Sequence, residues 1–208
     1  MNKHTLSVLK FLKIKEMLIK YTVSVIGEEI ANQIEPENNL DKIINSLKET
    51  SEMREILIIE GVPPFSRTED IRDELKKSKI GGMIIDTLKI LKILKVLQVS
   101  RKVKKYFLKS KDKYSLIKKK LEKIKLFSDL EKEIIYCIGE NAEVLDRASY
   151  ELKMIRKEII KKEQNIKDKL EKIIRSSQFS DIIQDPIITI RQDRYVIPIK
   201  QGRKGKFP

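Results

Sequence analysis

Hydrophobic residues recur every three or four positions through most of the chain, which is the spacing of amphipathic helices. A first helix is expected from Thr5 to about Tyr21, and a second from about residue 40 to residue 59, capped by Asn38 or Asn39. Gly61 and the Pro-Pro pair after it should end the second helix, because proline cannot continue a helical hydrogen-bond ladder. Thr68 is then expected to cap a short helix.

The stretch from residue 83 to about residue 109 is expected to form one long helix. Lysines occur at every third position from Lys89 to Lys95, and Gln98 and Arg101 continue the series. A three-residue repeat drifts around a helix that has 3.6 residues per turn, so the apolar positions also occupy more than one face. We therefore predict that this helix is packed on more than one side, with lysine stems reaching outward.

Further helices are predicted downstream. Asp112 should cap a helix over 113–125, and Ser128 with Glu131 forms a capping-box pattern for a helix to Ile138. Ser149 should cap the clearest helix, over 150–175, which would be about 39 Å long at about 1.5 Å per residue. Its apolar residues follow a heptad-like seam that suits a rod packed against a partner helix. The seam consists of Leu152, Ile155, Ile159, Ile166, Leu170 and Ile173.

The chain changes character after this helix. Two β-prone runs, 187–190 and 195–199, flank a short polar segment and predict a hairpin. The fold class expected is therefore mostly α: a helical bundle with a long lever-like helix and a C-terminal β-hairpin. The expected division is a helical core subdomain over 1–145 and a second part over 146–208.

Positive charge is concentrated in the middle of the chain. Residues 83–125 carry 15 Lys and Arg against 3 Asp and Glu, which accounts for +12 of the formal net charge of +14. A concentrated field of one sign attracts polyanions, so nucleic acid is the candidate partner, and a solvated lysine face is the alternative. The candidate contact residues are Lys89, Lys92, Lys95, Arg101, Lys102, Lys104, Lys105 and Lys109.

Several classes of site are not supported by the composition. One Cys and one His cannot supply a zinc site of the usual kind, and no Gly-rich loop has the spacing that surrounds a phosphate. No apolar run reaches the length of about 18 residues that a membrane span requires, and no secretion signal is evident, so we expect a soluble cytoplasmic protein. We assign no catalytic residue, no metal ligand and no cofactor to these 208 residues, and expect this part not to be an enzyme.

Three segments together resemble one protein family. They are GVPPF with the EDIRDELKKSKIGG stretch, AEVLDRASYELKMIRKEI, and QDPIITIRQDRYVIPIK, and SRKVKKYF also resembles a basic helix of that family. Their order and spacing are similar to the N-terminal region of the bacterial MutS-two proteins, paralogues of the mismatch-repair MutS proteins. The family hairpin usually turns on Asn-Gly, whereas this chain has Gln192-Asp193, so a looser turn is expected.

The resemblance implies that residues 146–208 begin a core and lever domain that continues in a longer protein. That protein would bind ATP and Mg²⁺, dimerise through its ATPase and carry a C-terminal endonuclease domain. It would bind branched DNA, restrain homologous recombination and act on collided ribosomes. The role implied here is mechanical transmission with a basic nucleic-acid contact. A purely structural scaffold, or a module that binds rRNA without contacting DNA, remains an alternative.

Overall fold

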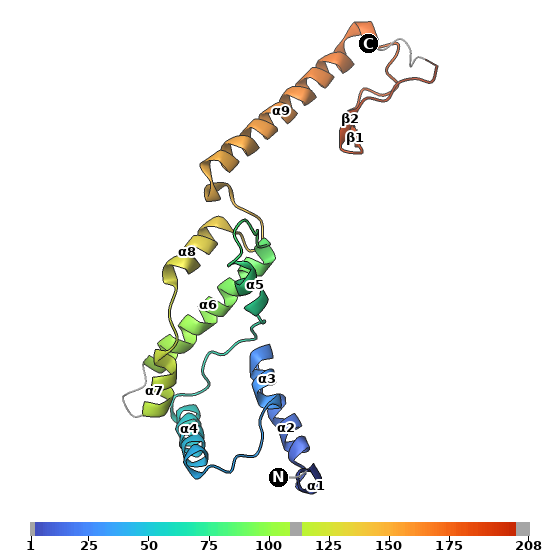
Figure 1. The fold of residues 1–208 in the computed structure, drawn as a ribbon. Coiled ribbons are helices and arrows are strands. Elements are labelled where there is room, and N and C mark those ends of the chain that lie inside the picture. The colour runs from blue at the N-terminus through green and yellow to red at the C-terminus, as the bar shows by residue number, and fades with distance from the viewer. Residues whose placement is uncertain (1–2, 109–113, 203–208) are drawn as a thin grey trace. The chain divides into compact units, whose positions relative to one another are not determined.

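The computed structural model describes residues 3–108 and 114–202 and divides the chain into two compact units, Met1–Leu145 and Asp146–Pro208 (Figure 1). Helices dominate the described residues, and the two strands form an antiparallel hairpin near the C-terminus. The predicted fold class, mostly α with a long helix and a C-terminal hairpin, is confirmed.

The first unit contains the shorter helices and one long one. Their bounds are α1 (Lys3–Val8), α2 (Phe11–Ile19), α3 (Val25–Asn32), α4 (Leu40–Ile59), α5 (Arg72–Lys77), α6 (Thr87–Leu108), α7 (Ser115–Glu122) and α8 (Ser128–Cys137). The second unit contains the 3₁₀ turn η1 (Asp146–Ala148), α9 (Tyr150–Arg175), the 3₁₀ turn η2 (Ser177–Phe179), β1 (Thr189–Arg191) and β2 (Arg194–Val196).

The start of the chain differs from its prediction. The single helix expected from Thr5 is divided into α1 and α2, because Lys10 adopts a left-handed conformation with φ of 51°. Such a residue cannot continue a right-handed helix. A further helix then begins at Val25, because the Ser24 side chain accepts a hydrogen bond from the Gly27 amide at 3.0 Å and caps α3.

Three predicted helix ends are confirmed. Asn39 caps α4 by accepting a hydrogen bond from the Lys42 amide at 3.1 Å, and Gly61 follows α4 with φ of 87°. Ser149 caps α9, where its hydroxyl accepts from the Leu152 amide at 3.4 Å. These local signals determine the helix ends because their hydrogen bonds lie within three residues along the chain.

Two predicted caps are wrong. Thr68 pairs with Ser24 in an isolated parallel bridge, and α5 begins only at Arg72. Ser128 is the first residue of α8 and makes no capping hydrogen bond. The expected partner in the capping box, Glu131, is buried instead.

The hydrophobic core of the first unit lies along α6. One cluster joins Ile56 of α4 with Val103 and Phe107 of α6, together with Tyr114. A second cluster is formed by the N-terminal half of α6 with α8 and the residue that follows it, and contains Leu94, Ile134 and Ile138. Packing of α6 on more than one side, as predicted, is thus confirmed.

A carboxylate on α4 determines where α7 begins. Glu52 accepts hydrogen bonds from the backbone amides of Leu116 and Ile117, both at 3.0 Å. These amides lie in the first turn of α7, where no helical carbonyl can reach them, and the helix dipole favours a negative charge there. The predicted cap, Asp112, lies outside the described residues.

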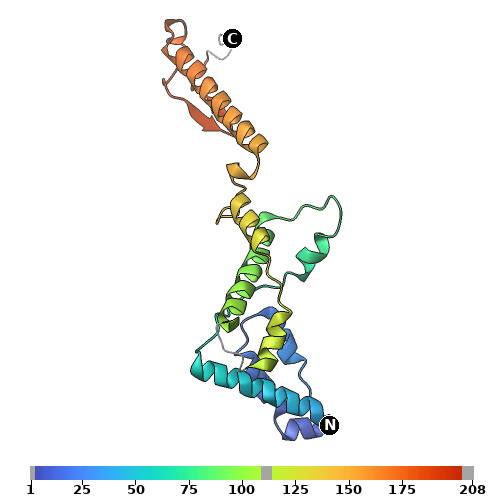
Figure 2. The same cartoon turned by 90° about the vertical axis from the view of Figure 1, so that its left-hand side faces the viewer.

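The second unit is built on α9, whose bounds match those predicted. Its seam is only partly covered, since Ile155, Ile159 and Ile166 keep 48%, 49% and 44% of their surface exposed. Figure 2 shows the ribbon of α9 and the hairpin of this unit. The Lys167 ammonium, in the C-terminal half of α9, lies 5.7 Å from the centroid of the Tyr195 ring of β2.

The hairpin turn is tighter than expected. Arg191 pairs directly with Arg194, so only Gln192 and Asp193 form the loop. Both have positive φ, 49° and 58°, as a primed two-residue turn requires. The expectation of a looser turn is therefore wrong: the chain makes the tight turn without the usual glycine.

Candidate nucleic-acid interface

The candidate cations divide into two groups according to their partners. Seven of the eight lie on α6 within the described residues, and Lys109 lies outside them. Three of the seven, Lys92, Arg101 and Lys104, make hydrogen bonds or ion pairs inside the fold. The other four, Lys89, Lys95, Lys102 and Lys105, have no ion pair with any residue that the structure describes.

Lys92 and Lys104 hold neighbouring segments against α6. The Lys92 ammonium forms an ion pair with Glu69, and hydrogen bonding to this carboxylate raises the pKa of Lys92 above its ordinary value. Lys104 donates a hydrogen bond to the carbonyl oxygen of Ile124 at 2.5 Å. Both side chains are half-buried, so their charges serve the packing of the unit.

Arg101 neutralises a buried carboxylate. Its Nε lies 2.9 Å from Glu131 Oε2, and the Glu131 side chain keeps only 5% of its surface exposed. A buried carboxylate without a partner would lower the stability of the fold by several kcal/mol. We therefore assign Arg101 a structural role, the neutralisation of Glu131 between α6 and α8. Glu131, which the sequence placed in a capping box with Ser128, is thus the ion-pair partner of Arg101, one of the candidate contact residues.

Three exposed lysines form a stripe on one side of α6. Lys95, Lys102 and Lys105 are separated by seven and three residues, which places them within about 80° of each other around the helix at 3.6 residues per turn. They extend over about 15 Å along the axis. We call these three residues the lysine stripe. Lys89 is half-buried and lies about 120° around the helix from Lys95.

Exposed cations continue on α7 and just beyond it. Lys119, Lys123 and Lys125 are exposed, and none of them has an ion pair within the described part of the chain, whereas Lys120 lies 2.5 Å from Glu49. These lysines were counted in the basic stretch but not chosen as contact residues, because the sequence did not show which of them acidic side chains would neutralise.

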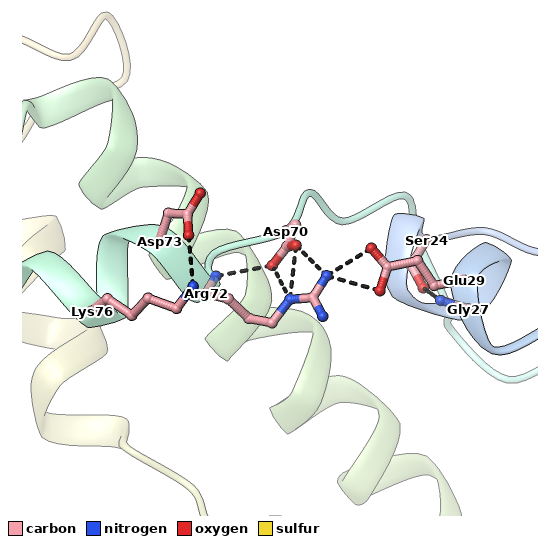
Figure 3. Close-up of polar contacts among 7 residues, drawn as sticks. All are labelled: Ser24, Gly27, Glu29, Asp70, Arg72, Asp73 and Lys76. Atoms are coloured by element: carbon pink, nitrogen blue, oxygen red, sulfur yellow. Dashed lines mark hydrogen bonds and ion pairs between the residues drawn. The ribbon is translucent and has the colours of Figure 1, made fainter.

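The preceding segment shows the opposite arrangement, in which cations are neutralised. The Arg72 guanidinium lies between two carboxylates, 2.7 Å from Glu29 of α3 and 2.8 Å from Asp70 (Figure 3). The hydrogen bonds from Arg72 hold the pKa of Asp70 at about 2. Lys76 is likewise paired with Asp73 at 3.1 Å. Ion pairs therefore neutralise the cations at Arg72 and Lys76, whereas the lysine stripe is exposed to solvent.

Other kinds of site are not found in the described residues. No group of three or more His, Cys, Asp or Glu is positioned there to hold a metal ion. No helix in the same residues combines the length and the apolar character that crossing a membrane requires. The thiol of Cys137 is free and half-buried, and it packs against the second core cluster.

Comparison with known proteins gives the family. The chain is 34% identical to endonuclease MutS2 of Halothermothrix orenii, 35% identical to that of Bacillus cytotoxicus and 36% identical to that of Acetivibrio thermocellus, and each alignment includes 100% of this chain. The chain belongs to the MutS2 family. No family model matches it.

The chain spans about a quarter of the length of these MutS2 relatives, 27%, 27% and 26% respectively. The match includes the lysine stripe, α9 and the hairpin, since it runs along the whole chain. The nuclease named in the relatives is a property of proteins much longer than these 208 residues.

Proposed function

We propose that this chain binds the sugar–phosphate backbone of a nucleic acid through the lysine stripe, and that α9 serves as a stiff arm. The observation that carries the proposal is the division of charges on α6. Cations next to the stripe are paired, whereas Lys95, Lys102 and Lys105 have no acidic partner among the described residues. Three unneutralised charges on one face of a helix would release counterions from a phosphate backbone.

The proposal extends to the longer protein as follows. The relatives are named endonucleases, so the partner we infer is DNA, in particular branched DNA, and the parent would restrain homologous recombination. We place ATP and Mg²⁺ binding, dimerisation and nuclease chemistry in other parts of the parent protein. The role of these 208 residues would be binding and transmission rather than chemistry.

The test compares two triple variants of the full chain. In the first, Lys95, Lys102 and Lys105 are changed to Gln; in the second, Lys13, Lys20 and Lys77 are changed to Gln. The second variant loses the same charge from exposed positions in the region 1–82, which has nearly balanced charge. Binding of a fluorescent branched duplex is measured between 50 and 200 mM salt, on the order of the range over which phosphate contacts change affinity most.

The stripe variant should have a log–log salt slope that is shallower by about 2 to 3 units, since each lost phosphate contact contributes about 0.9. The control variant should keep the slope of the parent chain to within about one unit. Equal slopes for the stripe variant and the unchanged chain would contradict the proposal and favour the scaffold alternative. The same titration with double-stranded RNA separates the rRNA alternative, because a binding module for rRNA would bind RNA and not the duplex DNA.

A further inference from the structure

The hairpin tip combines two features that oppose folding. Arg191 and Arg194 are directly opposed in the strand register, so two like charges lie with their Cβ atoms about 4.5–5.5 Å apart. The two residues between them, Gln192 and Asp193, both have positive φ, a conformation that is unfavourable for most residues other than Gly, Asn and Asp and therefore for Gln192. Unfavourable local conformations of this kind occur preferentially at binding sites.

The two arginines are available to a ligand. Both are exposed, and no ion pair joins either of them to a residue in the described part of the chain. Side chains alternate between the two faces of a strand, so Arg191 and Arg194 emerge from the face opposite Tyr195. Since the Tyr195 ring contacts Lys167 of α9, the arginines lie on the face of the hairpin that is turned away from this contact.

The hairpin is anchored at its base, which fixes the position of its tip within the second unit. The segment before β1 pairs with the segment after β2 through an isolated antiparallel bridge between Ile183 and Ile199. The Gln184 amide donates to the carbonyl of Pro198 at 3.0 Å, and the Lys200 amide donates to that of Ile182 at 2.9 Å. The tip is therefore the far end of a two-stranded ribbon, and these backbone hydrogen bonds fix the base of the ribbon.

We propose that the pair Arg191 and Arg194 binds a backbone phosphate of a nucleic acid. Guanidinium groups donate two parallel hydrogen bonds to a phosphate, and two of them on one face can hold its oxygens from both sides. A two-stranded ribbon also fits the major groove of duplex DNA, where its tip would reach the backbone. This inference adds a second contact to the proposed function, on a different unit of the chain.

Asp193 allows a test in which the proposal predicts tighter rather than weaker binding. Its carboxylate is located on the turn between the two arginines, where it would repel a phosphate. Asp193→Asn removes this charge and keeps a residue type that tolerates the left-handed conformation. If a phosphate binds at the tip, Asp193→Asn should tighten binding; weaker binding by this variant would overturn the proposal.

The main experiment uses the full chain and a fluorescent 20-base-pair duplex as the probe. The double variant Arg191→Gln, Arg194→Gln should raise Kd about tenfold, since hydrogen bonds to charged groups are the strong ones. The salt slope should fall by about 0.9 if both guanidinium groups hold one phosphate. Arg191→Lys with Arg194→Lys keeps both charges, so the slope should stay while Kd rises, because the forked geometry is lost.

The matched control changes Lys169 and Lys172 to Gln, which removes two exposed charges from α9 of the same unit. It should leave Kd near that of the unchanged chain. Far-UV circular dichroism should show the helices intact in every variant, since neutralising a like-charged pair removes a repulsion. If the Gln double variant and the control bind equally well, the proposal is overturned.

This outcome is distinguishable from failure of the proposed function. The stripe variant and the arginine variant are on different units and are measured with the same probe. A changed slope for the stripe variant alone would reject the hairpin contact and support the stripe. A change for the arginine variant alone would support the hairpin contact and reject the stripe.

Discussion

At the scale of single residues, the pair Arg101 and Glu131 is expected to be strongly asymmetric under substitution. Arg101→Gln leaves a buried carboxylate without its partner and should lower the free energy of unfolding by about 2–3 kcal/mol, somewhat less than for a fully buried pair because Arg101 is half-exposed. Glu131→Gln leaves the cation able to reach water and should cost less. Urea denaturation followed by circular dichroism measures both.

The combination of the two changes gives the control for this prediction. With both residues replaced by Gln, no buried charge remains, so the double variant should be more stable than Arg101→Gln alone. Simple addition of the two single effects would show that the pair is not coupled and would contradict the assignment of Arg101 to a structural role.

The turn of the hairpin offers a second prediction for single residues. Gln192→Gly relieves the left-handed strain at φ of 49° without changing the charge of the tip. The hairpin should gain about 0.5–1 kcal/mol, so its amide protons should exchange roughly two- to fivefold more slowly. Nuclear magnetic resonance at the Thr189 and Val196 amides measures this, because these two residues form a hydrogen-bonded pair of the antiparallel ladder. Gln192→Val, which is least compatible with positive φ, should speed exchange at the same amides.

At the scale of elements, Arg72 pairs with Glu29 of α3 and with Asp70 before α5, and this arrangement predicts an unusually low pKa for Asp70. Arg72 lowers the pKa of Asp70 from 3.8 to about 2. A carboxyl group whose pKa is lowered by folding stabilises the fold fully above its unfolded value, and this contribution is lost as the pH falls through the folded value. The contribution of Asp70 should therefore persist at neutral pH and disappear between about pH 4 and pH 2.

A carbon-detected magnetic resonance titration of the Asp70 carboxyl group tests this directly. Its midpoint should be near 2 in the unchanged chain and should rise part of the way toward 3.8 in Arg72→Gln, because the side-chain hydrogen bonds of Arg72 are the largest cause of the shift and its backbone amide still donates to Asp70. Lys76→Gln is the matched control, since Lys76 contributes the smallest of the effects on Asp70. An equal rise in both variants would show that the Arg72 side chain is not the main cause of the low pKa of Asp70.

The elements also show what the sequence could and could not predict. Helix ends set by contacts within three residues were predictable, such as the caps of α4 at Asn39 and α9 at Ser149. The start of α7 was not, because its cap comes from Glu52, which lies 64 residues away from the amide of Leu116. Local patterns contain no information about such distant partners, and the same limit applies to the candidate site.

For the cations of α6, the sequence showed the concentration of charge but not which side chains would pair with acidic residues and which would stay unpaired. The three-residue repeat placed the cations around the helix, and only packing against α8 and the segment around Glu69 decided which would be paired. Arg101 was chosen as a contact residue and is paired with a buried carboxylate. Whether the unpaired lysines bind nucleic acid stays a prediction.

At the scale of the whole molecule, two surfaces of opposite character coexist. Charge gives the chain a formal +14, most of it in residues 83–125. The seam of α9, by contrast, leaves Ile155, Ile159 and Ile166 nearly half exposed within its unit. Salt screens the repulsion between positively charged copies, and contiguous exposed apolar surface favours association. Self-association and nucleic-acid binding should therefore respond to salt in opposite directions.

Sedimentation velocity tests this prediction. Between about 50 and 500 mM salt, self-association of the chain should strengthen as repulsion is screened, whereas binding to a duplex should weaken over the same range. Ile159→Lys places a charge on the seam and should abolish the association. Asn165→Lys adds the same charge about 120° away from Ile159 around α9 and should leave association nearly unchanged. Association that weakens with salt, or that Ile159→Lys leaves intact, would show that copies meet through charged surfaces rather than through the apolar seam.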